Sequence, residues 1–396
     1  MRIAFVTDGF WPRINGLTIS VDTFCTSLVE LGHEVHVITN RYSAEDDLFD
    51  AREPERKVHR FPSSRSWLSA EDNQVLPHAY WRVYTTLVKI DADIIHIHTA
   101  EFTLGQIAKL YAWHKHKPLV MSSHTHWEKY LHNYLPILPI KFAQRLARFI
   151  MHHVFRNADV LITPSVFHRD VMVSYGIPKS WIHVIPTGFK LSSFELDPEE
   201  NRRVHEEFHA LHPRLKVARK LLFVGRIGKE KNIDLFLDVM DLVVKVFPET
   251  ILIMVGDGPY RKTFAHLVHM RGLQDHFIFT GFIDHWKIKY FYSDADVFTF
   301  PSITETQGMV TVEAMACRTP VVAVGEMGTF FVMGGDNGGY LVPNDAKAFA
   351  KRVIELLSDN VLRESKAIEA YNFAQGWSIN RMTKKLLDLY SGLISN

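Results

Sequence analysis

Short apolar runs alternate along this chain with longer segments in which apolar residues recur every three or four positions. Residues 2–7 are predicted to form a buried strand, 17–31 a helix that ends at Gly32, and 35–39 the next strand. The same order of strand, turn and helix restarts near residue 220. Strands that are apolar throughout and alternate with helices are typical of parallel sheets. The pattern therefore predicts an α/β protein with two doubly wound sheets.

Chain length and turn residues indicate how the chain divides. A chain of 396 residues exceeds what one hydrophobic core usually supports, so two domains are expected. The turn Pro-Thr-Gly at 186–188 is the predicted boundary. We therefore expect a first domain over 1–190, a second over 191–375 and a terminal helix over 376–396.

Composition narrows the class of protein. A formal net charge of +1, with 47% apolar and 22% charged residues, is ordinary for a soluble globular protein and predicts no nucleic-acid partner. The only cysteines are Cys25 and Cys317, so neither a disulfide framework nor a cysteine metal site is predicted, and a reducing cytoplasm is the simpler setting. No run of about eighteen apolar residues and no signal-peptide pattern occurs, so we expect neither a membrane span nor secretion.

The stretch 298–324 carries the clearest candidate chemistry. A β-rich run ends at Pro301, a polar loop holds Glu305, and a glycine opens a helix. The first amides of such a helix, together with the positive end of its dipole, suit an anion such as a phosphate. The amides in question are those of Gln307, Gly308 and Met309.

Two carboxylates flank this helix start. Glu305 lies on the loop and Glu313 lies early in the helix. Carboxylates repel a phosphate, so their expected role is to accept hydrogen bonds from neutral hydroxyls, such as those of a sugar and a ribose. That combination indicates a nucleotide sugar. A solvent-exposed loop glutamate and a glutamate that favours a helix N-terminus would give the same pattern, and the residues alone leave both readings open.

The same stretch carries a resemblance. PSITETQGMVTVEAMACRTPVVA resembles the signature of glycosyltransferase family 4, a group of retaining transferases with the GT-B fold. The resemblance implies two Rossmann-like domains facing a central cleft, with the last helix crossing back to the first domain. It also implies that Glu305 contacts the donor sugar hydroxyls and that Glu313 binds the ribose hydroxyls. Gln307 departs from the family pattern, in which an aromatic residue is common there.

Two cations follow a strand of the second sheet. Arg226 ends that strand and Lys231 lies five residues further on, where cations can bind a diphosphate and stabilise it as it leaves. Decoration of a helix cap is the alternative. The family pattern Val-Gly-Arg followed by Glu-Lys-Asn is matched at 224–226 and 230–232, which implies that Gly225, Arg226 and Lys231 contribute to the donor pyrophosphate site.

Glycines at other strand ends extend the donor site. The loop 8–16 places Gly16 before a helix, where the absence of a side chain lets a phosphate approach, and the resemblance assigns this loop to the donor phosphate. Gly256, in the turn VGDGP, is expected to let the nucleotide base approach. The glycine-rich stretch 325–343 is predicted to form a loop at the pocket rim.

Histidines gather in the first domain. A strand that ends at Ser122 is followed by His124, Trp127 and Tyr130, in a segment that resembles the bacterial diacylglycerol glucosyltransferase branch of family 4. His124 is the residue we expect to hold a sugar hydroxyl or to move a proton, and the two aromatic residues are expected at the acceptor. At least one of His96 and His98 is predicted to be a core histidine paired to backbone, and no zinc site is predicted.

The predicted helix 139–156 has a cationic stripe beside aromatic residues. Residues 101–190 hold eleven Lys or Arg against four Asp or Glu, which favours contact between the first domain and an anionic membrane surface. A solvated charged face is the alternative. The stripe includes Lys141, Arg145 and Arg148.

Together these features predict a retaining hexosyltransferase that needs no metal or other cofactor. We expect it to move a hexose, glucose first, from a nucleoside diphosphate sugar to a lipid such as diacylglycerol or a glycolipid, with UDP favoured over GDP. The expected location is the cytoplasmic face of the inner membrane, as a peripheral protein. The alternatives are a soluble, polysaccharide or lipopolysaccharide acceptor, a GT-B nucleotide-sugar epimerase, and a binding protein without turnover.

Overall fold

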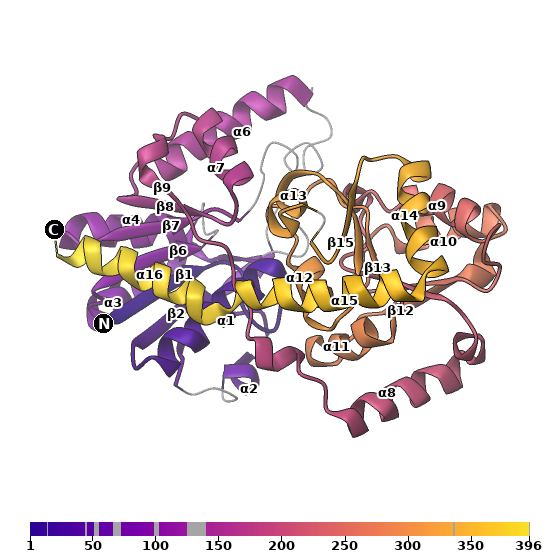
Figure 1. The fold of residues 1–396 in the computed structure, drawn as a ribbon. Coiled ribbons are helices and arrows are strands. Elements are labelled where there is room, and N and C mark those ends of the chain that lie inside the picture. Colours follow the sequence, from indigo (N-terminus) through magenta and orange to yellow (C-terminus); the bar gives the residue numbers. More distant parts are fainter. Residues whose placement is uncertain are drawn as a thin grey trace. The chain divides into compact units, whose positions relative to one another are not determined.

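The chain forms two compact units. The computed structural model describes residues 1–13, 15–43, 46–50, 55–65, 73–98, 103–124, 140–335 and 337–395 (Figure 1). Unit 1 comprises Met1–Phe189 and Ile379–Asn396, and unit 2 comprises Lys190–Ser378. Each unit is built around its own parallel sheet, as the apolar pattern predicts.

Unit 1 contains a seven-stranded parallel sheet of order β3-β2-β1-β6-β7-β8-β9. A small antiparallel pair, β4 (Ser63–Arg65) and β5 (Asn73–Val75), lies outside it. The strands are β1 (Arg2–Thr7), β2 (Glu34–Asn40), β3 (Lys57–Phe61), β6 (Ile94–His98), β7 (Leu119–Ser122), β8 (Val160–Thr163) and β9 (Ile182–Val184). The α-helices are α1 (Gly16–Glu30), α2 (Asp46–Asp50), α3 (Tyr80–Ile90), α4 (Leu104–Lys115), α6 (Ile140–Phe155), α7 (Val166–Ser174) and α16 (Ile379–Ile394).

The winding direction of this sheet reverses between β1 and β6. Thr7 pairs with His98 in register, so the two strands end side by side. In open parallel sheets, ligands bind beyond the carboxyl ends of the strands at such a reversal. The candidate histidines of β6 and of the segment after β7 therefore lie at the edge where this fold places its ligands.

The last helix, α16, belongs to unit 1 and lies against α1, as Figure 1 shows in yellow and indigo. Thr383 donates a hydrogen bond to Ser27 Oγ at 2.9 Å, and the buried Tyr390 reaches His96 of β6. Side-chain hydrogen bonds to two elements of unit 1 therefore fix the position of this helix.

Unit 2 contains a six-stranded parallel sheet of order β12-β11-β10-β13-β14-β15. The strands are β10 (Lys220–Val224), β11 (Ile251–Val255), β12 (Phe277–Gly281), β13 (Val297–Phe300), β14 (Val321–Val324) and β15 (Gly339–Val342). The α-helices are α8 (Pro198–Leu211), α9 (Leu235–Val243), α10 (Arg261–Met270), α11 (His285–Asp294), α12 (Met309–Ala316), α13 (Met327–Met333), α14 (Ala346–Ser358) and α15 (Asn360–Ala374).

The stretch predicted as a pocket-rim loop has a different structure. Within this stretch Met327–Met333 form the helix α13 and Gly339–Val342 form the strand β15, so the prediction of a loop was wrong. Glycines end the helix, because Gly334 adopts a left-handed φ of 60° at its C-terminus. The apolar residues of α13, which include Val332 and Met333, are buried and give the helix its packing face.

No helix in the described part of the chain combines the length and the apolarity that crossing a bilayer requires. The two cysteines are buried free thiols.

Candidate functional site

The loops that follow β10 and β13 form one structure in unit 2. The two strands are neighbours in the sheet, so their carboxyl ends lie together. Asn232 Nδ2 donates to the carbonyl of Pro301 at 3.0 Å, and Thr304 Oγ1 donates to the carbonyl of Glu230 at 3.1 Å. These bonds connect two segments about seventy residues apart in sequence and bring the predicted cations beside the predicted carboxylate.

Lys231 and Glu305 form the centre of this structure. The Lys231 ammonium lies 2.5 Å from Glu305 Oε1, and Ser302 Oγ donates to the same oxygen at 2.8 Å. Both side chains are largely shielded, with 16% and 17% of their surfaces exposed. A carboxylate with two partners on one oxygen has a fixed orientation, which leaves its second oxygen suited to a ligand hydroxyl.

Arg226 is exposed and contacts Glu230, the residue before Lys231. Its guanidinium is 2.6 Å from Glu230 Oε1, an ion pair across four residues. The Glu230 carboxylate occupies the space next to Gly228, where an added Cβ would lie 2.2 Å from it. Because Gly228 has no side chain, the Glu230 carboxylate can occupy this space and form its ion pair with Arg226.

The start of α12 and the loop before it pack against α13. Gly308 has a left-handed φ of 79°, and an added Cβ there would lie 3.0 Å from Thr329 Oγ1. Gly328 of α13 donates its amide to the Glu305 carbonyl at 2.9 Å. The Gln307 side chain is buried and donates to the sulfur of Met309 at 2.8 Å. The loop that carries Glu305 is therefore packed on both sides.

Glu313 is buried in α12 and has partners that sequence reasoning missed. Tyr292 Oη donates to Glu313 Oε2 at 2.9 Å, and His285 Nε2 lies 3.9 Å from Oε1. Burial opposes charge on His285, but the neighbouring Glu313 carboxylate outweighs it, so the pKa of His285 is raised. Tyr292 and His285 lie in an aromatic-rich helix typical of core packing, so no sequence signal marked them.

Two of the predicted glycines bring strand ends together. An added Cβ on Gly256 would lie 2.0 Å from the carbonyl oxygen of Gly225, and their φ angles are 133° and 154°. The Gly225 amide donates to Val255 and the Gly256 amide donates to Gly281, each at 3.0 Å. The backbone packing between the ends of β10 and β11 therefore requires glycine at position 256, whether or not a nucleotide base binds there.

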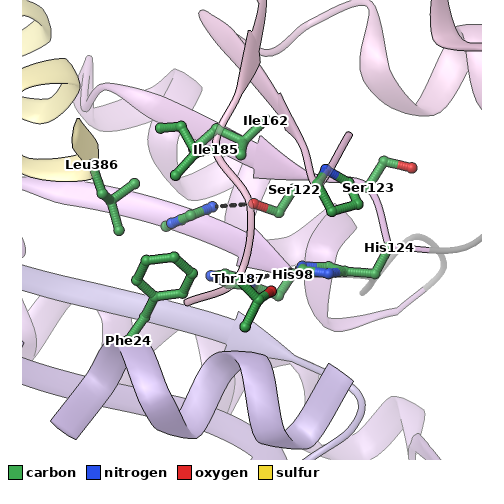
Figure 2. A pocket seen from close by; sticks show the side chains of 11 residues that line it. Phe24, His98, Ser122, Ser123, His124, Ile162, Ile185, Thr187 and Leu386 are labelled. Carbon is green, nitrogen blue, oxygen red and sulfur yellow. Dashed lines mark hydrogen bonds between the residues drawn. The ribbon is translucent and has the colours of Figure 1, made fainter. Parts of the chain in front are cut away.

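The predicted histidine of unit 1 lines a small pocket at the ends of β6 and β7. Figure 2 shows His98, Ser122, Ser123 and His124 around it. His98 Nδ1 lies 3.2 Å from His124 Nε2. Burial lowers the pKa of His98 well below its usual value and the pKa of His124 to about 4, so both rings are neutral at pH 7.

His96 has a different set of partners. Its Nδ1 lies 2.5 Å from Tyr390 Oη and its Nε2 lies 2.8 Å from Ser122 Oγ. The prediction that at least one of His96 and His98 is a core histidine was therefore correct for His96, but its partners are side chains and not backbone. Among the described residues, no cluster of His, Cys, Asp or Glu side chains is arranged to hold a metal ion.

The remaining predicted residues of unit 1 are spread over other elements. Gly16 is exposed at the first position of α1. Beyond its chain neighbours and its own helix backbone, nothing in the described part of the chain lies within 4 Å of where its Cβ would be. Lys141, Arg145 and Arg148 are exposed on α6. Trp127 and Tyr130 lie outside the described residues.

Comparison with known proteins places the chain in a family. Residues 14–193 match the family described as Glycosyltransferase Family 4, and residues 205–373 match Glycosyl transferases group 1. The chain is 30% identical to an alpha-monoglucosyldiacylglycerol synthase of Streptococcus pneumoniae, over 82% of this chain and 71% of that protein. It is 29% identical to the protein of that name from Acholeplasma laidlawii, over 87% of this chain and 86% of that protein.

A solved structure matches the fold along nearly the whole chain. The Anabaena protein HepE in complex with UDP has a TM-score of 0.79 at 18% identity, over 99% of this chain and all of that one. Two Rossmann-like units with this likeness define the GT-B fold of glycosyltransferases. The chain belongs to glycosyltransferase family 4 and is similar to its bacterial diacylglycerol glucosyltransferase branch, as its motifs predict.

Proposed function

We propose that the protein is a retaining hexosyltransferase that moves glucose from UDP-glucose to a membrane lipid, diacylglycerol or a glycolipid, and forms an α-glycoside. The names of the similar synthases support glucose and a diacylglycerol-type lipid. The UDP complex of HepE supports UDP, and the same Anabaena protein also matches in complex with UDP-glucose.

The observation that carries this proposal is the ion pair between Lys231, in the loop after β10, and Glu305, in the loop after β13. A shielded ammonium beside an exposed guanidinium, Arg226, suits a diphosphate, and a carboxylate with one oxygen engaged suits the hydroxyls of the sugar attached to it. Glu313, with Oε2 already bonded to Tyr292, would take ribose hydroxyls through Oε1.

The chemistry assigned to these residues is stabilisation of the leaving group. The bond between the sugar C1 and the β-phosphate oxygen breaks, and a bond from C1 to the acceptor oxygen forms on the same face. The proton of the acceptor hydroxyl goes to the departing phosphate. Lys231 and Arg226 offset the charge that develops on the diphosphate, so the reaction needs no divalent metal. A covalent adduct between sugar and enzyme, trapped with a poor acceptor, would overturn this route.

A membrane acceptor is supported by the outer surface of the helices of unit 1. The helices α3, α4 and α6 contribute to one core cluster and together contain seven Lys or Arg and no Asp or Glu. Four large aromatic side chains on them are exposed by 55% to 76%. Aromatic and basic residues together are typical of surfaces that lie on anionic lipid. These aromatic residues are Trp81, Trp113, Phe142 and Phe149. We propose that the protein is peripheral at the cytoplasmic face of the inner membrane, and these exposed residues support contact with lipid.

The test is a matrix of nucleotide sugars against lipid and soluble acceptors. UDP-, GDP- and ADP-glucose and UDP-galactose are each supplied with diacylglycerol, monoglucosyldiacylglycerol in anionic vesicles, or soluble glycans. We expect UDP release only with UDP-glucose and a lipid, and an anomeric proton in the product with the small coupling of an α-glycoside. Transfer to soluble glycans alone, or conversion of the sugar without an acceptor, would contradict the proposal.

A further inference from the structure

The pair formed by His98 and His124 contains an asymmetry. His98 is 1% exposed, and its Nδ1 faces His124 Nε2 at 3.2 Å. Its other ring nitrogen, Nε2, is buried and has no hydrogen-bond partner in the part of the chain that the structure describes. His96 lies two residues away on the same strand, and both of its ring nitrogens have partners.

The ring of His98 cannot easily turn to exchange its nitrogens. The Phe5 ring lies at 4.7 Å between centroids on one side, and the His96 ring lies at 3.9 Å. Figure 2 shows His98 and His124 together at the edge of the pocket. The contact between the two histidines is therefore a fixed feature of the strand ends.

Two neutral imidazole rings joined by one hydrogen bond can place their protons in two ways. In one, His98 Nδ1–H donates to His124 Nε2, which leaves a bare nitrogen buried at His98 Nε2 and the proton of His124 on Nδ1. In the other, His124 Nε2–H donates to His98, which leaves a buried N–H on His98 without an acceptor. Buried N–H groups without an acceptor are rare in native proteins, so the first arrangement is favoured.

We propose that His98 is a positioning residue that fixes the proton of His124 on Nδ1, so that His124 acts toward a bound hydroxyl as a neutral hydrogen-bond donor and not as a general base. The contact with a hydroxyl of the sugar or acceptor rests on the proposed function, whereas the position of the proton does not. The low pKa of His124, about 4, agrees with a ring that stays neutral during the reaction. The other titratable groups close to the pair on the described elements are His96, His168 and Tyr390.

The proton position is measured directly by long-range proton–nitrogen NMR of the full chain labelled with ¹⁵N-histidine, without substrate. We expect Nδ1 of His124 to appear as the protonated nitrogen at pH 7, and His98→Leu to shift the proton to Nε2, the form that neutral imidazole prefers in water. His78→Leu removes an exposed ring from the same unit and serves as the control, which leaves the proton on Nδ1. A wild-type His124 protonated on Nε2, or an unchanged tautomer in His98→Leu, would overturn the proposal.

Kinetics with UDP-glucose and diacylglycerol vesicles give the second readout. An asparagine amide can take the place of Nδ1–H, whereas a glutamine amide reaches the position of Nε2. We expect His98→Asn to keep kcat within about tenfold and His98→Gln and His98→Leu to lose about 10- to 100-fold, with a smaller change in KM. Equal loss in all three variants would contradict a positioning role. If wild type transfers no sugar, the proposed function fails, and the NMR result still decides the proton position.

Discussion

The ammonium of Lys231 lies 2.5 Å from Oε1 of Glu305, although 74 residues separate them in sequence. The pair joins the loop after β10 to the loop after β13, and Ser302 donates a hydrogen bond to the same carboxylate oxygen. If Lys231 binds the donor diphosphate as proposed, an ammonium held in this way needs little reorganisation when that ligand arrives.

Replacement of Lys231 or Arg226 by alanine is expected to lower turnover strongly. Removal of one partner of a charge contact that becomes desolvated in the donor complex costs about 2–5 kcal/mol, which corresponds to roughly 30- to several-thousand-fold in rate. The exposed Arg226 is expected at the lower end of this range. Steady-state release of UDP from UDP-glucose with a lipid acceptor measures the loss. Lys229→Ala is the control, because Lys229 is exposed in the same 3₁₀ turn as Lys231. Near-normal activity in both Lys231→Ala and Arg226→Ala would contradict the assigned donor site.

Periodic patterns predicted the elements well, because local spacing determines them. The strand expected at 35–39 is β2 (Glu34–Asn40), and the helix expected at 139–156 is α6 (Ile140–Phe155). The stretch 325–343 was predicted as a loop because its glycines dominate the local signal. The burial of apolar residues such as Val332 outweighs that signal and makes α13 a helix.

Contacts between distant segments set the limit of sequence reasoning at the site. The motifs identified Glu305 and Lys231 as separate candidates. Their hydrogen bond forms because β10 and β13 are neighbours in the sheet, which the motifs do not show. At least one of His96 and His98 was expected to bond to backbone, but His96 bonds to the side chain of Tyr390, which lies 294 residues away on α16. No periodicity or motif connects such residues. Tyr292 and His285, which contact Glu313, were missed for the same reason.

Tyr292→Phe is expected to weaken donor binding and leave the fold intact. The substitution removes only the hydroxyl that donates to Glu313 at 2.9 Å, so the carboxylate loses its fixed orientation. A hydrogen bond to a charged group contributes about 1.5–3 kcal/mol, of which a part appears as a loss of UDP affinity. Isothermal titration calorimetry with UDP measures this loss of affinity. Tyr260→Phe, which removes a hydroxyl 3.2 Å from Asp234 in the same unit, is the control. Equal UDP affinity in wild type and Tyr292→Phe would show that Glu313 does not bind the ribose.

His285 is expected to make the stability of unit 2 depend on pH. Glu313 raises the pKa of His285 in the folded chain despite burial, so the charged ring is favoured by folding. The stabilisation is complete below the unfolded pKa, about 6.5, and is lost as pH rises through the folded value. The difference in melting temperature between wild type and His285→Gln should therefore be larger at about pH 5.5 than at about pH 8.5.

The matched control for this measurement is His266→Gln, because His266 is exposed on α10 of the same unit. We expect its melting temperature to follow wild type at every pH. A difference between wild type and His285→Gln that grows with rising pH would contradict the assigned pair.

Arg145 and Arg148 are expected to support binding to anionic vesicles. Each basic residue near an anionic surface contributes about 1 kcal/mol, so Arg145→Ala with Arg148→Ala should weaken vesicle binding by about tenfold or more at low salt. Co-sedimentation with phosphatidylglycerol vesicles measures this. Removal of two charges from α8, by Arg202→Ala with Arg203→Ala, is the control. Binding that does not weaken with added salt would argue against electrostatic docking.

Substitution of Gly16 tests whether glycine is needed there for the fold or for binding of a ligand. Its backbone is not left-handed, and apart from its chain neighbours and its own helix backbone no described residue has an atom within 4 Å of an added Cβ. Gly16→Val should therefore change the free energy of unfolding by less than about 1 kcal/mol. If the donor phosphate approaches this helix start, the added methyl groups clash with it, and KM for UDP-glucose should rise by about tenfold or more. Gly376→Val is the control, because an added Cβ at Gly376 is equally uncrowded. A variant at Gly16 that keeps both its stability and its KM would remove this loop from the donor site, because the substitution would then have filled space that no ligand uses.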